Sequence, residues 1–240
     1  MNMSRFCHFF FSDISMNKKV FDSKKWALVA QELAAEELKL KSYDDLLIKL
    51  LGDITGQRVL DYGPGPAVLA SALQKMGAEV KTWDIDPKMN EICAERIGKE
   101  NAYTKSSQIP KNYFDFVVCN LVFCIDYEPE VRLILNNIKK ALKPNGSAFI
   151  GFCNPRLHNV KETNLDIRQC PGRKYEENHV YTKIKKEGNY EILEMHRPIE
   201  WYIAEYLKTG FILEDVVYTP EYELKGNKIS DFIVFKLTKK

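Results

Sequence analysis

The stretch that decides the fold is Arg-Val-Leu-Asp-Tyr-Gly-Pro-Gly-Pro-Ala-Val-Leu-Ala, residues 58–70. It combines a strand, a tight turn and the start of a helix. The apolar residues before Asp61 predict a short buried strand that stops at this acidic residue. Gly63 and Gly65 let the chain turn sharply and let a ligand approach the backbone, and the apolar spacing from Ala67 onward predicts a helix. The simplest interpretation is a ligand-binding corner between a strand and a helix.

A second strand and a second helix follow the corner, with acidic residues between them. Residues 80–83 predict a strand that ends in Asp84. Asp84 lies about twenty residues beyond the glycines, the distance at which a strand-helix-strand unit delivers a carboxylate to a ribose. Asp86 and Pro87 have the pattern of a helix N-cap and a first-turn proline, so an N-cap role already explains Asp86.

The corner resembles motif I of the class I S-adenosylmethionine-dependent methyltransferases, whose usual form is hydrophobic-hydrophobic-Asp-x-Gly-x-Gly-x-Gly. Asp61, Gly63 and Gly65 match three of its fixed positions, and Ala67 replaces the third glycine. The resemblance is to the small-molecule members of the family, of methyltransferase types 11 and 25.

Two prolines distinguish this copy of the motif. Pro64 and Pro66 each remove an amide donor from the turn. A pyrophosphate needs many converging N–H groups at a helix N-terminus, whereas the methionine end of S-adenosylmethionine presents one carboxylate and carries its own positive charges. The prolines therefore suit S-adenosylmethionine better than a dinucleotide.

The resemblance implies S-adenosylmethionine as the cofactor and S-adenosylhomocysteine as the product. In the family, the acidic residue that ends the second strand binds the ribose, which implies Asp84. Ser106 and Ser107 correspond to a polar position beside the adenine ring, although an ordinary surface loop also explains them. The cofactor-binding residues that the resemblance implies are Asp61, Tyr62, Gly63, Pro64, Gly65, Asp84, Ile85, Ser106, Ser107, Asn120 and Leu121.

The end of a further strand corresponds to the place of methyl transfer. Residues 114–120 are nearly all apolar, as in a central parallel strand. The segment resembles motif IV of the family, in which the end of this strand faces the methyl group that is transferred. An Asn-Pro-Pro-Tyr sequence there would signal methylation of an exocyclic or amide nitrogen, but the residues are Asn-Leu-Val-Phe at 120–123. The sequence therefore argues against a DNA or glutamine methyltransferase.

The second half of the chain completes the expected fold. Leu-Lys-Pro-Asn-Gly at 142–146 is a frequent turn of the family and precedes a predicted strand at 147–152. Strands predicted at 211–218 and 229–237 would form a terminal antiparallel pair, which a simple dinucleotide-binding fold lacks. We expect an α/β fold: a Rossmann-like, doubly wound, mostly parallel seven-stranded sheet with a terminal antiparallel strand, an N-terminal helical lid and a β-hairpin insertion after the fifth strand.

One domain with a sizeable core accounts for 240 residues, of which 45% are hydrophobic. Residues 1–15 precede a more ordinary N-terminus at Met16, and we expect them to be a disordered or dispensable extension. The expected parts of the single methyltransferase domain, 16–240, are a helical lid at 16–55, a cofactor-binding core at 56–153, a substrate-cover insertion at 154–198, and a C-terminal helix and strand pair at 199–240.

Candidate substrate and catalytic residues lie in the lid, the insertion and the last helix. Trp26 and Tyr43 could line the lid by resemblance, or could only pack its helices together. His196 is the candidate general base, because the pKa range of histidine suits proton removal and His196 borders the proposed cover. Local hydrogen bonds or binding of an anionic substrate group explain His196 and Arg197 equally well. The candidate substrate contacts are Trp26, Tyr43, Tyr181, Arg197 and Tyr202.

Composition narrows the class of protein. A formal net charge of +2 gives no bulk basic field, so nucleic acid is not an expected partner. The six cysteines are scattered without a Cys-x-x-Cys pair, which favours reduced core residues of an intracellular protein, and no cluster has metal-ligand spacing. No stretch reaches membrane-spanning length. We therefore expect a cytoplasmic protein without bound metal, as a monomer or a homodimer.

Four functions remain open from the residues. The first is methyl transfer to nitrogen, oxygen or carbon of a small molecule, by a direct displacement that depends mostly on alignment in a dry pocket. The second is methylation of tRNA or protein, with a basic rim of Lys183, Lys185, Lys186 and Arg197. The third is a non-catalytic S-adenosylmethionine-binding protein, suggested by the missing third glycine. The fourth is an NAD-linked oxidoreductase, which Val68 disfavours because it occupies the third glycine of Gly-x-Gly-x-x-Gly.

Overall fold

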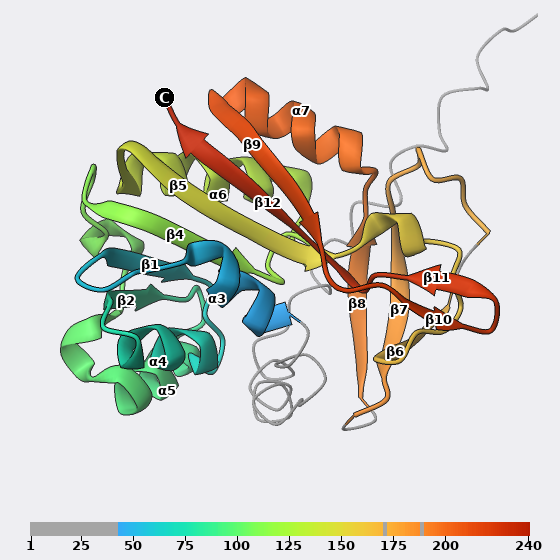
Figure 1. Ribbon diagram of the computed structural model, residues 1–240, viewed down its shortest axis with the longest axis horizontal. Coiled ribbons are helices and arrows are strands. Elements are labelled where there is room, and N and C mark those ends of the chain that lie inside the picture. Colours follow the sequence, from blue (N-terminus) through green and yellow to red (C-terminus); the bar gives the residue numbers. More distant parts are fainter. Residues whose placement is uncertain (1–42, 170–171, 188–189) are drawn as a thin grey trace, which may run out of the picture.

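A seven-stranded sheet forms the centre of the computed structural model, which describes residues 43–169, 172–187 and 190–240 (Figure 1). The strand order is β3-β2-β1-β4-β5-β12-β9. The five strands from β3 to β5 are parallel, and β12 runs antiparallel to both of its neighbours. The strands are β1 (Arg58–Tyr62), β2 (Glu79–Trp83), β3 (Ala102–Tyr103), β4 (Phe114–Asn120), β5 (Leu142–Cys153), β9 (Phe211–Tyr218) and β12 (Phe232–Lys239). The predicted mostly parallel sheet with a terminal antiparallel strand is confirmed.

Helices cover both faces of this sheet and enclose two apolar cores. The helices are α3 (Asp45–Leu51), α4 (Val68–Lys75), α5 (Pro87–Ile97), α6 (Glu128–Ala141) and α7 (Ile199–Thr209), with short 3-10 turns η3 (Lys99–Asn101), η4 (Ser106–Gln108) and η5 (Pro155–Leu157). Buried residues of α6 and α7 pack with β4, β5 and β12 in one core. Buried residues of α3, α4 and α5 form the second core. In Figure 1, α3 lies in front of the sheet and α6 behind it. Among the described helices, none is both long and apolar enough to cross a membrane.

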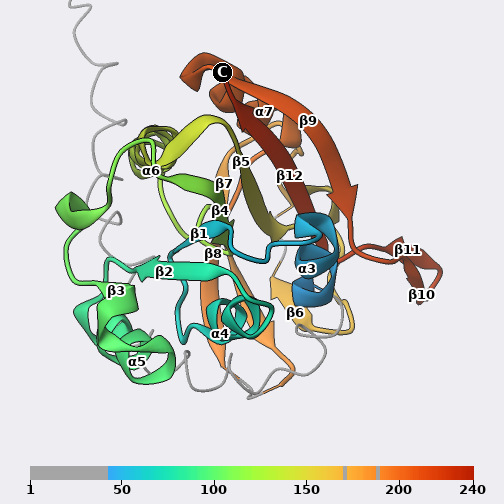
Figure 2. The same ribbon diagram turned by 60° about the vertical axis from the view of Figure 1, so that its left-hand side comes forward.

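A second, three-stranded sheet lies between β5 and α7 in the sequence. It consists of β6 (Asp166–Gln169), β7 (His179–Lys185) and β8 (Glu191–His196), all antiparallel. The sequence predicts the pairing of β7 with β8 but not the addition of β6. The amide of Met195 on β8 donates to the carbonyl of Cys124 at 2.7 Å, so this sheet is tied to the loop after β4. A further hairpin of β10 (Tyr222–Leu224) and β11 (Asn227–Ile229) projects from the molecule between β9 and β12 (Figure 2).

The start of β5 differs from the expected pattern. The strand β5 begins at Leu142 and not at residue 147, so it includes the turn sequence. Asn145 has a φ of 62°, and the pairing register with β4 shifts between Phe114 and Phe116. The turn is therefore an irregularity at the start of a long strand. Residues 1–42, which include Trp26 and most of the predicted helical lid, lie outside the described residues.

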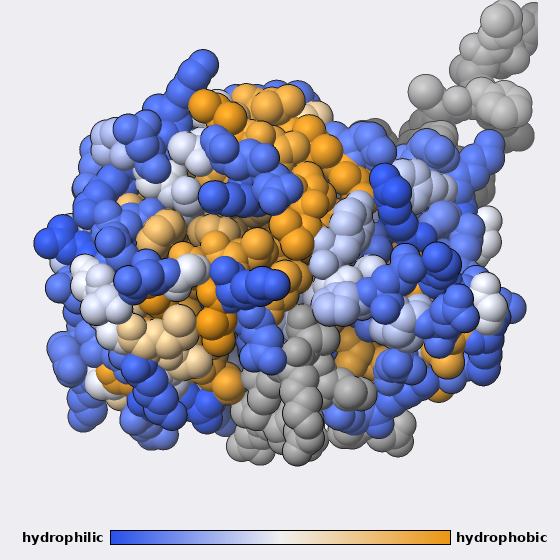
Figure 3. Space-filling view, in the orientation of Figure 1, coloured by the Kyte–Doolittle hydropathy of each residue, from blue (hydrophilic) through white to orange (hydrophobic). Residues whose placement is uncertain are grey.

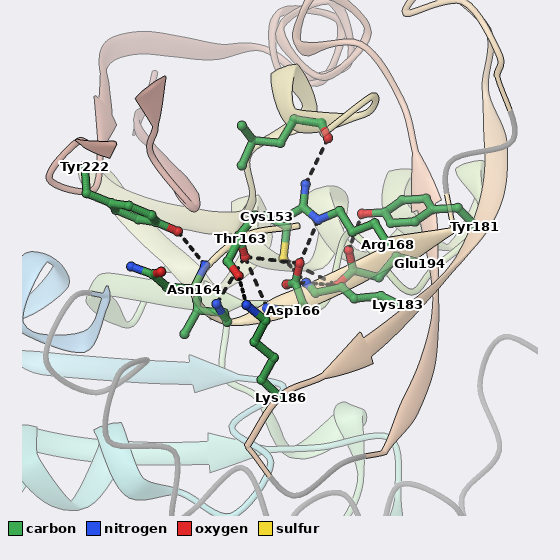
Figure 4. A network of polar contacts seen from close by, with 12 residues as sticks. Cys153, Thr163, Asn164, Asp166, Arg168, Tyr181, Lys183, Lys186, Glu194 and Tyr222 are labelled. Carbon is green, nitrogen blue, oxygen red and sulfur yellow. Dashed lines mark hydrogen bonds and ion pairs between the residues drawn. The ribbon is translucent and has the colours of Figure 1, made fainter. Parts of the chain in front are cut away.

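A buried cluster of four charged side chains holds the three-stranded sheet together (Figure 4). Lys183 Nζ lies 3.0 Å from Asp166 Oδ2 and 2.9 Å from Glu194 Oε1. Arg168 Nε lies 2.8 Å from Asp166 Oδ1. Burial raises the pKa of Asp166, but Lys183 and Arg168 outweigh burial and hold this pKa well below its usual range. All four groups therefore remain charged inside the protein.

The charged face of β7 is the buried one. Lys183 and Lys185 are 2% and 5% exposed, whereas Val180 is 39% exposed. The sequence pattern, in which apolar residues alternate with charged ones, suggests the opposite orientation. The hydroxyl of Tyr181 also points into the cluster and donates to Glu194 Oε2 at 2.6 Å. Cys153, at the end of β5, lies 2.9 Å from Lys183 Nζ, which connects the cluster to the central sheet.

Replacement of Lys183 by methionine should strongly destabilise the fold. The change leaves the buried carboxylates of Asp166 and Glu194 without their shared cation, and breaking one side of a buried ion pair typically costs about 3–5 kcal/mol. Denaturant unfolding measures this loss. Lys228→Met on β11 removes a lysine whose side chain is 70% exposed, so its effect should stay within about 0.5 kcal/mol. Equal effects of the two substitutions would contradict the buried cluster.

Candidate functional site

A cavity of about 420 Å³ opens where β1, β2 and β4 end. Its position is the one at which ligands bind in doubly wound sheets, outside the carboxyl ends of the strands where the strand order reverses. The lining residues come from the corner after β1 and the start of α4, the end of β2 and the start of α5, the 3-10 turn η4, the end of β4 with the loop that follows it, and the helix α6. They are Asp61, Tyr62, Gly63, Pro64, Gly65, Pro66, Val68, Leu69, Trp83, Asp84, Ile85, Asp86, Met89, Ser106, Asn120, Leu121, Val122, Ile125, Asp126, Glu130, Leu133, Ile134 and Asn137.

The glycine corner is shaped by backbone that favours glycine. Gly63 and Gly65 have φ values of 75° and 53°. A Cβ atom on Gly63 would lie 2.5 Å from Val122 Cγ2, whereas a Cβ atom on Gly65 would meet nothing within 4 Å. Ala67, at the position of the family's third glycine, has a φ of 55°. A methyl side chain therefore tolerates the left-handed conformation that explains the family's preference for glycine there.

The amides of the corner are already used within the protein. Pro64 and Pro66 have none, and the remaining three donate to neighbouring oxygens. These bonds run from Gly63 N to Trp83 O at 2.9 Å, from Gly65 N to Asp84 Oδ2 at 3.3 Å, and from Ala67 N to Pro64 O at 3.1 Å. The corner thus lacks the free converging donors that a pyrophosphate requires.

Asp84 connects the glycine corner to the end of β2. Its Oδ2 accepts from Gly65 N at 3.3 Å and its Oδ1 accepts from Asp86 N at 2.9 Å. The main chain of Asp84 is held by Asn90, which accepts from its amide and donates to its carbonyl. Burial raises the pKa of Asp84 to about 6. Asp86 caps α5, because its Oδ1 accepts from Lys88 N at 2.9 Å, and it also lines the cavity.

Asn120 ends β4 in a fixed orientation. Tyr43 Oη donates to Asn120 Oδ1 at 3.1 Å. Burial, and next Asp44, raise the pKa of Tyr43 well above its usual value, so the phenol keeps its proton. Gly151 lies opposite Asn120 in the pairing of β4 with β5, and a Cβ atom on Gly151 would lie 1.8 Å from Tyr43 Oη. Only glycine at position 151 therefore leaves room for the tyrosine hydroxyl.

The residue after Asn120 has a strained backbone. Leu121 has a φ of 57°, a conformation that bulky side chains rarely adopt, and its amide donates to the carbonyl of Gly151 at 2.8 Å. Strained backbone of this kind is concentrated at ligand-binding and active sites. The strain turns the chain sharply out of β4, so that Leu121 and Val122 both line the cavity.

Two exposed apolar side chains line the cavity. Ile85 and Leu133 are 70% and 60% exposed, and both line the cavity. Ser106, on η4, lines the same cavity, whereas Ser107 does not. An exposed apolar pair of this kind can cover the two faces of a flat ring such as adenine.

The sequence predictions did not include the contribution of α6. Glu130, Leu133, Ile134 and Asn137 all line the cavity, and their spacing is that of one helical face. This face mixes polar and apolar residues, so hydrophobic periodicity does not reveal it. The loop residues Ile125 and Asp126 were also absent from the predicted site.

The structure brings ten of the eleven predicted cofactor-binding residues to the cavity, all except Ser107. None of the candidate substrate and catalytic residues that the structure describes lines the cavity. Tyr43 reaches the cavity only through Asn120, and Tyr181 points into the buried charged cluster. Trp26 lies outside the described residues.

Arg197 and Tyr202 lie behind the loop that follows β4. The Arg197 guanidinium is buried and donates from Nη1 to the carbonyl of Phe123 at 3.1 Å. It also donates to Tyr202 Oη at 3.3 Å and to the carbonyl of Asp126. Arg197 therefore fixes the shape of the segment that carries Ile125 and Asp126 into the cavity.

His196 lies in a separate cluster of rings. Its Nε2 lies 2.8 Å from the carbonyl of Tyr175, so this nitrogen carries the proton and donates. The rings of His158 and His179 have centroids 5.2 Å and 4.8 Å from that of His196. Burial lowers the pKa of His196 to about 4. The side chain is therefore neutral near pH 7 and does not line the cavity.

Known proteins resemble this chain over its central part. Residues 60–150 match the family model described as a methyltransferase domain. The chain is 35% identical over 97 residues to the ribosomal protein L11 methyltransferase of Ralstonia pickettii, which covers 35% of this chain and 33% of that protein. It is 26% identical over 145 residues to the demethylmenaquinone methyltransferase of Tropheryma whipplei, which covers 58% of this chain and 60% of that protein. The chain thus spans less than two thirds of the length of either relative.

A solved structure shares the fold over most of the chain. The 1,6-didemethyltoxoflavin-N1-methyltransferase of Burkholderia thailandensis, solved with 1,6-didemethyltoxoflavin and S-adenosylhomocysteine, superposes with a TM-score of 0.57. The match covers 90% of this chain and 87% of that one, at 15% sequence identity. The sheet and helices described above are therefore those of a methyltransferase fold.

Alanine at position 63 should disturb the corner more than alanine at position 65. Both substitutions place a side chain in left-handed backbone, at a cost of about 1 kcal/mol each. Gly63→Ala adds a collision with Val122, and overpacking typically costs about 1–3 kcal/mol more. Denaturant unfolding compares the two variants. Val122→Ala in the Gly63→Ala background should recover part of the loss, and equal losses at the two glycines would contradict the described corner.

Alanine at position 151 should displace Tyr43 from Asn120. Tyr43→Phe removes only the hydroxyl and should cost about 1 kcal/mol, the typical value of one hydrogen bond. Gly151→Ala collides with the hydroxyl and should cost more than Tyr43→Phe. Unfolding free energies of both variants and of the double variant test this coupling. Strict additivity would show that Gly151 and Tyr43 do not share this space.

Proposed function

We propose that this chain is a class I S-adenosylmethionine-dependent methyltransferase, which binds S-adenosylmethionine in this cavity and transfers the methyl group to a small molecule. The acceptor is a nitrogen, oxygen or carbon atom, and S-adenosylhomocysteine is the product. The observation that carries the proposal is the carboxylate of Asp84 beside the glycine corner, at the ends of two adjacent parallel strands. This is the arrangement that presents an acidic side chain to a ribose.

The cavity fits the cofactor in size and chemistry. A volume of about 420 Å³ lies within the range of small-molecule sites. Asp84 would hold the ribose hydroxyls, and Ile85 and Leu133 would cover the adenine ring, with Ser106 at its edge. The corner would accommodate the methionine part, because this part needs few anion-binding donors.

S-adenosylmethionine supplies an activated methyl group when it is bound. The protein's own contribution is then alignment and exclusion of water. Asn120 and Leu121 stand at the end of β4, where Tyr43 and the strained backbone hold them in place. Val122 packs against Gly63 and closes the space between the loop and the corner. These contacts fix the walls within which donor and acceptor would meet.

The substrate side is proposed to lie under the insertion, residues 154–198, with the N-terminal region as a lid.

The single-domain division and the role of His196 as a base stay predictions. Turnover of the His196→Ala variant, once an acceptor is known, tests the base assignment; unchanged turnover would discard it. Neutral His196 can accept a proton only through Nδ1, because Nε2 already donates to Tyr175.

A macromolecular substrate is the second candidate, and the structure offers it little support. Lys183, Lys185 and Arg197, which were expected to form a basic rim, are buried. Lys186, the fourth member, is paired with Glu162 at 2.9 Å. These residues therefore do not present the row of free cations that phosphate binding requires. Retention on RNA at physiological salt would nevertheless favour this candidate.

Two further candidate functions are an NAD-linked oxidoreductase and a non-catalytic S-adenosylmethionine-binding protein. An NAD-linked oxidoreductase would need free amides at the corner, and those of residues 63, 65 and 67 are occupied. A non-catalytic binding protein was suggested by the missing third glycine, yet Ala67 adopts the required backbone. We also propose a cytoplasmic location and a monomer or homodimer, which fractionation and light scattering can examine.

Calorimetry with S-adenosylmethionine and with NAD tests the proposed function. Binding of the first without the second is expected, and absence of S-adenosylmethionine binding would refute the proposal. Asp84→Ala should weaken binding by about 1–3 kcal/mol, because ribose hydroxyls would lose a charged acceptor. Glu79→Ala, at the opposite end of the same strand, should leave the affinity unchanged. Thermal unfolding of each variant separates loss of binding from loss of fold.

A further inference from the structure

The loop between β4 and α6 places an unpaired carboxylate in the cavity. Asp126 lines the cavity, and its main-chain carbonyl accepts from the Arg197 guanidinium. Within residues 43–169, 172–187 and 190–240, no side chain or amide forms a hydrogen bond or ion pair with the carboxylate itself. A half-buried carboxylate without a partner is costly unless it takes up a proton or a cation.

The groups around Asp126 come from three elements. Glu130 lies in the first turn of α6, Asp84 at the end of β2, and Arg197 just before α7. Burial raises the pKa of Asp126 to about 7, Glu130 and Asp84 add to the increase, and Arg197 opposes it. At neutral pH the side chain is thus divided between its protonated and ionised forms.

Apart from tyrosine, the titratable side chains among the described lining residues are all carboxylates. They are Asp61, Asp84, Asp86, Asp126 and Glu130, and no lysine, arginine or histidine of the described residues lines the cavity. The cavity therefore has a negative potential, which favours a ligand with an excess of positive charge. S-adenosylmethionine carries a net charge of +1 through its sulfonium, and S-adenosylhomocysteine, with a neutral thioether, carries none.

We propose that Asp126 is the residue that selects the charged cofactor over the neutral product. Arg197 holds the main-chain carbonyl of Asp126, and the Asp126 carboxylate lines the same cavity as Asp84. This carboxylate attracts the sulfonium form, and the attraction is lost once the methyl group has left. This inference rests on the proposed function. It goes beyond ribose recognition by Asp84, since both cofactor and product contain the same ribose. Because S-adenosylhomocysteine is then held less tightly than S-adenosylmethionine, inhibition by this product is weaker.

The proposal predicts that binding of S-adenosylmethionine releases protons and depends on pH. A positive charge in the cavity stabilises the ionised form of Asp126 and lowers its pKa, so binding of S-adenosylmethionine near pH 7 releases a fraction of a proton. Affinity for S-adenosylmethionine should therefore rise as the pH is raised through the pKa of Asp126. S-adenosylhomocysteine should release fewer protons and show a flatter dependence.

Calorimetry in two buffers of different ionisation enthalpy measures the affinity for each ligand and the number of protons released on binding. The ligands are S-adenosylmethionine, S-adenosylhomocysteine and sinefungin, in which an amine supplies the positive charge in place of the sulfonium. The wild-type chain should bind both cationic ligands with proton release and prefer them over S-adenosylhomocysteine. Asp126→Asn should reduce this preference about tenfold, which corresponds to about 1.4 kcal/mol, and should reduce the proton release. Asp126→Glu should restore part of both.

Control measurements separate the possible outcomes. Glu214→Gln removes one exposed negative charge from β9, at the sheet edge far from β2 and β1, and should change neither quantity. Thermal unfolding shows whether Asp126→Asn keeps its fold. If S-adenosylmethionine binds but the preference and the proton release are the same in Asp126→Asn as in the wild-type chain, the role of Asp126 is refuted while the proposed function stands. If none of the three ligands binds to the wild-type chain, the proposed function fails and the inference fails with it.

Discussion

The carboxylate of Asp84 is the constraint on which the cavity depends. It accepts from the amide of Gly65 on one side and from the amide of Asp86 on the other, so the glycine corner, the end of β2 and the start of α5 meet at one group. Asn90 holds the main chain of Asp84 in turn. A ligand that uses the remaining lone pairs of Asp84 therefore finds a site already formed, and little free energy is needed to organise it.

Other packed elements and hydrogen bonds hold the remaining walls of the cavity in place. The parallel strands β1, β2 and β4 deliver their last residues to one edge, and one face of α6 forms a further part of the cavity wall. Arg197 holds the loop after β4 from behind, and Tyr43 holds Asn120. Hydrogen bonds between buried groups restrict the movement of the segments that they join. The cavity thus combines apolar walls with a few carboxylates whose positions are determined by the fold.

Much of this arrangement could be predicted from the sequence, because its signals are local. Asp61, Gly63 and Gly65 identify the corner, and the acidic residue about twenty positions later identifies the ribose position. The alternation of strands and helices predicts a mostly parallel sheet, and the two strands near the end of the chain predict its antiparallel part. Each of these inferences depends on residues close together in the chain, where backbone geometry is set by neighbours.

The remainder depends on packing between distant segments, and local patterns did not reveal it. Leu133 reaches the cavity because α6 lies against the sheet with one particular face, and Asp126 reaches it because Arg197 holds the loop before that helix. The lysines of β7 were expected at the surface, yet Lys183 is buried because Asp166 on β6 and Glu194 on β8 neutralise it. Charged residues are almost never fully buried unless they are paired, and such pairs are formed by tertiary structure. The position of His196, away from the cavity, follows from the same antiparallel sheet.

The most direct test of the account is a crystal structure of the full chain grown with S-adenosylmethionine. The account predicts an adenosyl group in the cavity, with the ribose hydroxyls on Asp84, the adenine between Ile85 and Leu133, and the methionine part along Gly63 and Gly65 toward Asn120. Density for the cofactor at any other place, or an empty cavity at saturating cofactor, would contradict it.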